Sequence, residues 1–197
     1  LVKNAEALEL MADVDTLIVD KTGTLTEGKP ALTDVTSFGD VPEDELLAAA
    51  AALERASEHP LAEAIVEGAK ARGLSLGNGE EFEAVTGKGV IGKVDGRDVA
   101  LGNNALMTSL GIDCDTGEET ADRLRGEGKT AMFVALDGRL AGLVAVADPI
   151  KPTAEAAIRD LHDLGIKVIM ATGDNERTAL AVASRLGIDE VRAGMLP

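Results

Sequence analysis

The sequence predicts an α/β fold in two parts: a parallel, Rossmann-like domain formed by the two ends of the chain, and an inserted α+β domain built on an antiparallel sheet. Buried strands followed by helices occur near both ends, which is the order found in parallel sheets. In between, short strands are joined at Asp95-Gly96 and Asp137-Gly138, pairs that supply the positive φ of antiparallel hairpins. We place the inserted domain at residues 33–138 and the flanking domain at 1–32 and 139–197.

The flanking domain is expected to hold four elements, in the order strand 17–19, helix 152–164, strand 166–171 and helix 176–186. Its first strand is apolar throughout, which predicts burial on both faces. Pro152 opens the first helix and Gly165 follows it, while Gly187 stops the second helix. The first helix presents an apolar stripe, formed by Ile158, Leu161 and Leu164.

The inserted domain is expected to begin with two helices and to continue with short strands. Pro42 and Pro60 open the helices 42–54 and 60–72, because proline is favoured in a first helical turn. The strands are expected at 81–86, 89–94, 99–101, 131–136 and 140–146. Their hairpin connections require antiparallel pairing, so this architecture differs from that of the flanking domain.

The composition is that of a soluble globular protein, with 45% hydrophobic and 27% charged residues. A formal net charge of −16 argues against nucleic acid and against anionic membrane surfaces as partners. No apolar run approaches the roughly 20 residues that span a bilayer, and no secretory signal is visible. The single cysteine cannot form an internal disulfide, and with two histidines it forms no convincing metal cluster. We expect Cys114 to be an incidental surface or loop residue.

The most informative motif is the run DKTGTLT at residues 20–26, directly after the first strand. Open α/β sheets bind their ligands at the carboxyl ends of their strands, where Asp20 is expected. The glycine and threonines that follow supply a tight turn, backbone N–H groups and hydroxyls, which suit a phosphoryl group. Asp20 is therefore a candidate nucleophile for phosphoryl transfer. The alternative is an aspartate that caps a turn.

DKTGTLT resembles the phosphorylation motif of P-type ATPases, ion pumps whose catalytic domain belongs to the haloacid-dehalogenase superfamily. The resemblance covers the whole chain in order and is closest to the copper pumps among the heavy-metal type. It implies a haloacid-dehalogenase-type phosphorylation domain with an inserted nucleotide-binding domain. The run from Lys3 to Glu9 resembles the link from a preceding membrane helix in that family.

The resemblance assigns the phosphorylation chemistry to two motifs. Asp20 would attack the γ-phosphoryl group of ATP, next to Lys21, and Asp20 and the main-chain carbonyl of Thr22 would hold Mg²⁺. Phosphatases of the superfamily usually carry an acid where this chain has Thr22, which favours a pump. The run Thr172-Gly173-Asp174 resembles the family's TGD motif: the Thr172 hydroxyl and Gly173 N–H would face the phosphate, and Asp174 the nucleotide or hinge. Alternatively, Asp174 only caps a helix.

Two further elements match the family. Asp148-Pro149-Ile150-Lys151 matches its DxxK element, in which Lys151 offsets phosphate charge or is a solvated hinge residue. The run Ser57-Glu58-His59-Pro60 resembles the SEHP motif of heavy-metal pumps, in which His59 would meet adenine; the alternative is a helix-capping histidine. The remaining nucleotide-site residues implied by the resemblance are Glu54, Gly87, Gly89, Gly102 and Asn103.

We therefore expect the ATP-binding region of a heavy-metal, Cu(I)-type P-type ATPase, with ATP and Mg²⁺ as cofactors. Its partners would be ATP and the membrane helices of the same pump, with no nucleic acid and no membrane insertion of its own. It would lie on the cytoplasmic side of the cell membrane. Two alternatives stay open: a phosphatase with a large cap domain, and a nucleotide-binding module without turnover. The sequence given stops at Pro197, before the family's lysine and GDGxND motifs, so slow turnover is expected.

Overall fold

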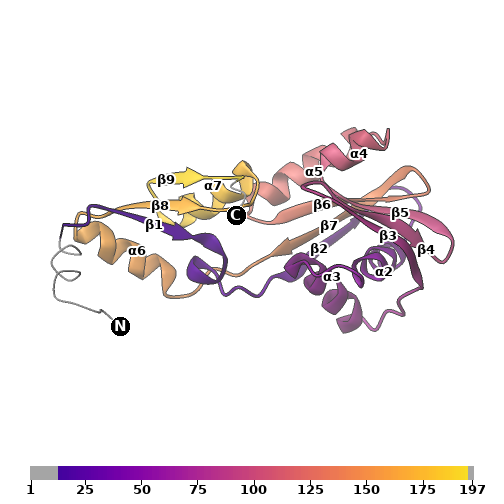
Figure 1. Ribbon diagram of the computed structural model, residues 1–197, viewed down its shortest axis with the longest axis horizontal. Helices are drawn as coiled ribbons and strands as arrows, with labels where there is room; N and C mark the ends of the chain where they lie inside the picture. The colour runs from indigo at the N-terminus through magenta and orange to yellow at the C-terminus, as the bar shows by residue number, and fades with distance from the viewer. Residues whose placement is uncertain (1–12, 195–197) are drawn as a thin grey trace. The chain divides into compact units, whose positions relative to one another are not determined.

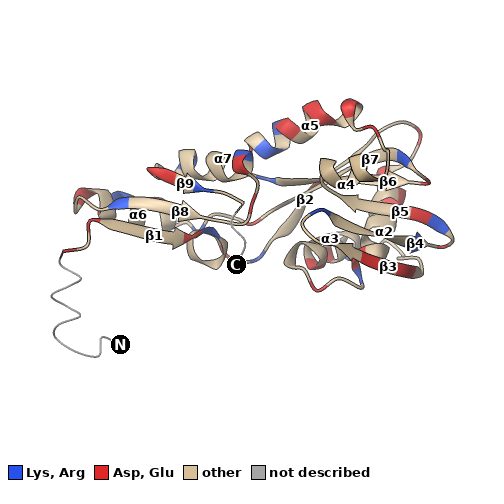
Figure 2. Cartoon of the chain, turned by 45° about the horizontal axis from the view of Figure 1, so that its top comes forward, with Lys and Arg blue, Asp and Glu red and all other residues tan. Residues whose placement is uncertain are grey.

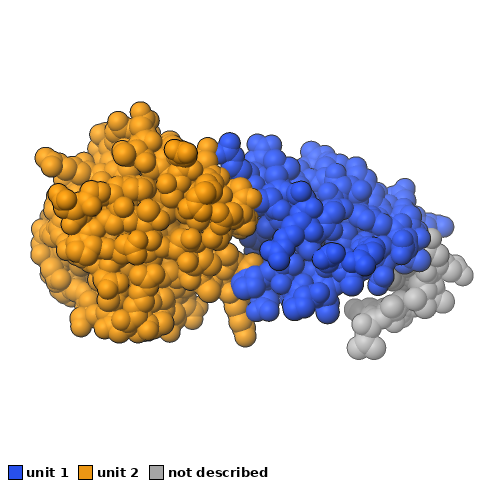
Figure 3. All heavy atoms as spheres, turned by 180° about the vertical axis from the view of Figure 1, so that it is seen from behind, with its two compact units in different colours: residues 1–28, 149–197 blue, residues 29–148 orange. Residues whose placement is uncertain are grey.

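A computed structural model describes residues 13–194, which form two compact units (Figures 1 and 3). Unit 1 combines the two ends of the chain, up to Gly28 and from Pro149 onward, and unit 2 is Lys29–Asp148. The predicted link at Lys3 to Glu9 lies outside the described residues. None of the helices in the described part of the chain is both long and apolar enough to cross a membrane.

Unit 1 contains a three-stranded parallel sheet in the order β1 (Thr16–Asp20), β8 (Lys167–Ala171), β9 (Glu190–Arg192), with β8 in the middle (Figure 1). Its helices are α6 (Ala154–Asp163) and α7 (Glu176–Leu186). Both helices pack into one apolar cluster with Val168 and Met170 of the central strand. Residue Asp20 pairs with Ala171, so the loops after β1 and β8 emerge side by side. The parallel α/β prediction for this part of the chain is confirmed.

Two burial predictions for unit 1 are wrong. Ile18 is 68% exposed, because β1 is an edge strand among the described residues and α6 and α7 pack against Val19, on the opposite face. Leu164 is 75% exposed, because α6 ends at Asp163 and Gly165 turns the chain with a φ of 77°. The apolar stripe of α6 therefore ends at Leu161.

Unit 2 contains a six-stranded antiparallel sheet. Its strands are, in sheet order, β2 (Ala31–Ser37), β7 (Arg139–Ala147), β6 (Thr130–Leu136), β5 (Arg97–Gly102), β4 (Gly89–Val94) and β3 (Gly79–Val85). Both predicted hairpin turns are present, with positive φ at Asp95-Gly96 and at Asp137-Gly138. The antiparallel prediction for the inserted domain is confirmed.

Helices cover both faces of this sheet. On one face α2 (Glu43–Glu54) and α3 (Pro60–Ala71) bury Leu46, Leu47 and Ile65 against Val90 and Val144. On the other face α4 (Asn104–Ser109) and α5 (Asp115–Gly126) bury their apolar side chains around Phe133. Because each strand alternates its side chains between two cores, the sheet is the central layer of unit 2.

The units divide at 28/29 and 148/149, whereas the sequence analysis placed the divisions at 32/33 and 138/139. The reason is the pairing of β7, which lies between β2 and β6 and so belongs to the antiparallel sheet over its whole length. The ends of unit 2 adjoin, since the Lys29 N–H donates to the Asp148 carboxylate at 3.0 Å.

The sequence analysis expected Cys114 to be a surface or loop residue. It lies in the loop before α5, but it is buried, with 4% exposed, and packs in the cluster around Phe133. It immediately precedes α5, a helix that the sequence analysis did not predict. Acidic residues begin this helix and basic residues end it, as Figure 2 shows. Burial, followed by the nearby acidic side chains of Glu118, Asp113 and Asp115, raises the pKa of the Cys114 thiol to about 11.

Candidate functional site

Asp20 ends β1 and points its carboxylate into solvent, without a hydrogen bond or ion pair to any residue between 13 and 194. The next residues form a tight turn, Lys21–Leu25, in which Gly23 takes a φ of 75°. The fully buried Thr26 closes this turn: its hydroxyl accepts from the Gly23 N–H at 3.2 Å and donates to the Lys21 carbonyl at 3.1 Å. Asp20 is thus an exposed carboxylate on a rigidly closed turn.

The loop after β8 meets this turn through an ion pair. Lys21 is turned inward, 7% exposed, and its ammonium contacts the Asp174 carboxylate. Thr172 is buried, and its hydroxyl accepts from the Asp174 N–H at 3.2 Å, which leaves its proton free to donate. Parallel pairing of β1 and β8 therefore brings Asp20, Lys21, Thr172 and Asp174 to one edge of the sheet.

The alternative reading of Asp174 as a helix cap is wrong. The cap of α7 is Asn175, whose side-chain oxygen accepts from the Thr178 N–H at 3.0 Å. Lys151 contacts the turn after Asp20 in two ways. Its side-chain ammonium donates to the Gly23 carbonyl at 2.6 Å, and its backbone N–H donates to the Leu25 carbonyl at 2.9 Å. Lys151 therefore contacts the turn after Asp20 and is not merely a solvated hinge residue.

Glu54, Ser57 and His59 form a second group in the connection from α2 to α3. Glu54 is 7% exposed, and within residues 13–194 its Oε2 atom is buried without a hydrogen-bond partner. Burial raises the pKa of the Glu54 carboxyl, although a hydrogen bond to Ser57 opposes the shift. A buried acceptor without a donor is unfavourable, so a ligand that donates a hydrogen bond would be stabilised here.

His59 caps α3, as the alternative reading proposed. Its Nδ1 accepts from the Leu61 N–H at 3.2 Å, so a neutral His59 carries its proton on Nε2. The ring is exposed, and capping therefore leaves the Nε2–H and the ring faces open to a ligand.

The three glycines predicted for the nucleotide site have different surroundings. Gly87 has a φ of 71°, and nothing lies within 4 Å of a Cβ built on it, so its surface is open. Gly89 and Gly102 pair across β4 and β5, and a Cβ on either would lie 2.2 or 2.3 Å from a carbonyl oxygen of the opposite segment. These two glycines are thus required for close strand approach.

Asn103 connects to the same turn. Its amide donates to the Gly87 carbonyl at 2.9 Å, and its side-chain oxygen accepts from the Leu106 N–H at 3.0 Å, which caps α4. Its own N–H donates to the Lys88 carbonyl at 2.9 Å. Asn103 therefore fixes the Gly87–Gly89 turn. Sequence reasoning assigned this residue to the ligand and missed its intramolecular contacts.

The two groups of residues that were predicted to bind nucleotide adjoin the same strand, β4. Leu53 in the last turn of α2 packs on Gly92 of β4, where a Cβ would lie 2.8 Å from the Leu53 side chain.

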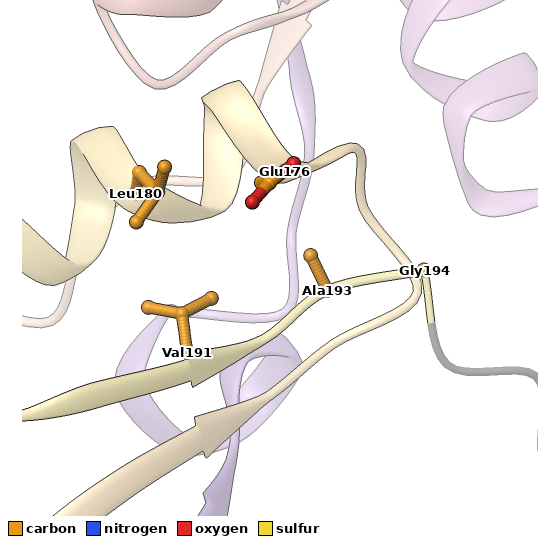
Figure 4. A pocket seen from close by; sticks show the side chains of 5 residues that line it. All are labelled: Glu176, Leu180, Val191, Ala193 and Gly194. Atoms are coloured by element: carbon orange, nitrogen blue, oxygen red, sulfur yellow. The ribbon is translucent and has the colours of Figure 1, made fainter.

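Two pockets elsewhere on the two units contain none of the predicted site residues. One, of about 370 Å³, lies beside α7 and β9 and is lined by Glu176, Leu180, Val191, Ala193 and Gly194 (Figure 4). The other, of about 460 Å³, includes Ile91, Lys93 and Ala100 of unit 2.

A family model described as haloacid dehalogenase-like hydrolase matches residues 14–196. The chain belongs to this family of hydrolases. Among curated proteins, the chain is 66% identical over 197 residues to a copper-transporting P-type ATPase of Rhizobium leguminosarum bv. viciae. The matched region covers 100% of this chain and 23% of that protein. The chain spans about a quarter of the length of the curated relatives it matches.

Solved structures of P-type ATPases are also similar to this chain. A zinc-transporting PIB-type ATPase in the E2.Pi state is 36% identical with a TM-score of 0.74, covering 100% of this chain and 32% of that one. The catalytic domain of the CPx-ATPase CopB-B, studied for conformational changes upon nucleotide binding, is 26% identical with a TM-score of 0.69, covering 99% and 69%. The predicted resemblance to the catalytic region of heavy-metal P-type ATPases is thereby confirmed.

Proposed function

We propose that this chain is the catalytic segment of a copper-transporting P-type ATPase, in which unit 2 binds ATP and Asp20 of unit 1 receives the γ-phosphoryl group. The observation that carries this proposal is the free carboxylate of Asp20 on its closed turn, next to Lys21, Thr172 and Asp174. The 66% identity to a copper-transporting relative supports the choice of copper.

The transfer can be written with these residues. A carboxylate oxygen of Asp20 forms a bond to the γ-phosphorus as the bond to the bridging oxygen breaks, and ADP leaves with that electron pair. The free proton of the Thr172 hydroxyl and the Gly173 N–H donate to the transferring group. Lys21, held by Asp174, lowers the negative potential around Asp20.

Mg²⁺ fits the donors at this edge. It prefers carboxylate and carbonyl oxygens, and it supplies charge neutralisation for the phosphate oxygens when bound. Asp20 and the main-chain carbonyl of Thr22 would hold it, because Asp20 is unpaired within the described residues and Thr22 is exposed in an extended conformation.

In unit 2, the buried Oε2 of Glu54 would accept from the adenine amino group, and the Nε2–H or ring face of His59 would meet the same base. The open surface at Gly87 would let the backbone approach the nucleotide. Gly89, Gly102 and Asn103 would act by shaping this turn. Metal transport, the membrane helices of the same pump and a cytoplasmic position belong to this proposal for the longer protein.

The nucleotide half is tested by calorimetric titration of the chain with ATP. His59→Gln should weaken binding by about 1–2 kcal/mol, the value of one or two ligand contacts, with the fold unchanged. Gly87→Asp should weaken it further, since it adds charge and bulk at the open surface. Unaltered affinity in His59→Gln would place the adenine site elsewhere.

The phosphorylation half is tested with γ-labelled ATP and Mg²⁺. Acid-stable label should appear on the chain and be absent in Asp20→Asn. Its formation should be slow in this segment alone, because Lys21 and Lys151 already contact Asp174 and Gly23 and offer limited charge to the phosphoryl group. Rapid turnover of phosphate monoesters would favour the phosphatase alternative, and ATP binding without any label would favour the module without turnover.

A further inference from the structure

Lys88, in the turn from β3 to β4, is a half-buried cation that has no partner among the residues that the structure describes. Most lysines and arginines of unit 2 are committed to ion pairs, such as Lys93 with Glu81 and Lys129 with Asp34. Within the described part of the chain, the Lys88 ammonium takes part in no ion pair or hydrogen bond. In a protein with a net charge of −16, an uncompensated and partly desolvated cation is unusual.

The backbone that carries Lys88 is fixed. Its N–H donates to the Val85 carbonyl at 2.9 Å, and its carbonyl accepts from the Asn103 N–H at 2.9 Å. Gly87 on one side is held by the Asn103 amide, and Gly89 on the other is pressed against Gly102. Less conformational freedom is therefore lost when the side chain binds a ligand than would be lost from a mobile loop.

Lys88 is the turn residue directly before β4, a strand that α2 covers on one face. Val90, two residues on, packs in the cluster of α2 and α3, and Gly92, four residues on, lies under Leu53. Leu53 precedes Glu54, which has the unpartnered buried oxygen. At up to about 3.6 Å per residue of extended chain, Gly92 and Lys88 are at most roughly 14 Å apart, a span that an extended nucleotide can cover from base to phosphates.

We propose that Lys88 binds the phosphate chain of the nucleotide whose base lies at Glu54 and His59. This inference rests on the proposed function of unit 2. With a net charge of −16, long-range attraction works against a polyphosphate, so a local cation has to supply the attraction. Lys88 then determines the preference for triphosphate over monophosphate, while Glu54 and His59 determine the preference for adenine.

The test compares Mg²⁺-free ATP, AMP and adenosine by calorimetric titration of the full chain, which separates Lys88 from the chemistry at Asp20. The original protein should bind ATP about three- to tenfold more tightly than AMP, as expected for one partly exposed charge contact. Lys88→Met should remove this difference and leave adenosine affinity unchanged. Lys88→Arg should restore it, and added salt should reduce it only where the cation is present.

Lys70→Met is the matched control, because Lys70 is exposed on α3 and paired with Glu67; it should keep the ATP-to-AMP ratio. An unchanged ratio in Lys88→Met overturns the assignment of Lys88, whereas absence of adenosine binding in the original protein overturns the proposed function of unit 2. Should Lys88→Met fail to fold, Lys88→Gln replaces it, and a salt-independent ATP-to-AMP ratio in the original protein overturns the assignment as well.

Discussion

Lys129 forms an ion pair with Asp34 at 2.8 Å and so fastens the segment after α5 to the edge strand β2. The same ammonium meets Glu127 at 2.7 Å. Burial by itself would raise the pKa of the Asp34 carboxyl, but the hydrogen bonds from Lys129 and Thr33 hold it below its ordinary value. The hydrogen bonds from Lys129 and Thr33 and the charges of Lys129 and Arg123 together therefore outweigh the desolvation of the carboxylate.

Lys129→Met should lower the free energy of unfolding by about 1–2 kcal/mol, since it leaves Asp34 partly buried without its cation. Because the folded pKa of Asp34 is depressed, this stabilisation is present above the ordinary value of 3.8 and is lost as pH falls through the folded value. Urea unfolding at neutral pH and near pH 3 should show the difference narrowing in acid. A difference independent of pH would contradict the ion-pair explanation. Lys70→Met, in an exposed pair, should change stability by less than about 0.5 kcal/mol.

Asn103→Asp and Asn103→Ala separate the two contacts of Asn103. Aspartate keeps an oxygen that can cap α4 but cannot donate to the Gly87 carbonyl, whereas alanine loses both contacts. Alanine should destabilise by about 1–2 kcal/mol, and aspartate by less, yet both should weaken ATP binding through the loosened turn. Thermal unfolding and calorimetry measure the two effects. Undiminished ATP affinity in both variants would mean that the turn does not contribute to the site.

Glu54→Gln should stabilise the nucleotide-free protein at neutral pH while weakening ATP binding. The folded pKa of Glu54 is raised, so the folded state holds its proton to higher pH than the unfolded chain does. Stability should therefore fall as pH rises from the ordinary value of 4.5 through the raised folded value, and this decline should be shallower in Glu54→Gln. Chemical unfolding from pH 4 to 8 checks the sign. A steeper decline in the variant would assign the pH dependence to another group.

Lys151→Ala should loosen the turn after Asp20, because it removes the 2.6 Å hydrogen bond to the Gly23 carbonyl. We expect faster amide exchange at Gly23 and Thr26 and a loss of about 1 kcal/mol in local stability, which Lys151→Arg should largely restore. Hydrogen-exchange NMR resolves these amides individually. Arg159→Ala serves as the comparison, since among residues 13–194 Arg159 pairs with Glu155 alone, on the exposed side of α6.

The sequence predicted the elements whose signals are local. Pro60 marked the start of α3, and Gly187 marked the end of α7. The two Asp-Gly turns marked hairpins that the structure contains. The DKTGTLT run and the TGD run were each predicted directly after a strand, and the structure shows that these two strands are parallel neighbours. These features depend on few residues, so their sequence is sufficient to indicate them.

Features that depend on distant partners were missed. The strand β2 is defined by pairing with β7, which lies more than a hundred residues later, and it carries a register shift between Leu32 and Asp34 that weakens its alternation. The helix α5 buries only Gly117, Ala121 and Leu124, which gives little apolar periodicity. The exposure of Ile18 and the intramolecular contacts of Asn103 likewise follow from tertiary neighbours, which no local pattern encodes.

The burial of Cys114 has a consequence for a protein whose relatives move copper. Soft metal ions bind the thiolate, and a thiol with a pKa of about 11 remains protonated in neutral solution. Its sulfur is also covered by the core around Phe133, out of reach of a passing ion. Cys114 is the sole cysteine in the sequence. The cysteine of this segment therefore offers no thiolate to a Cu(I) ion in neutral solution.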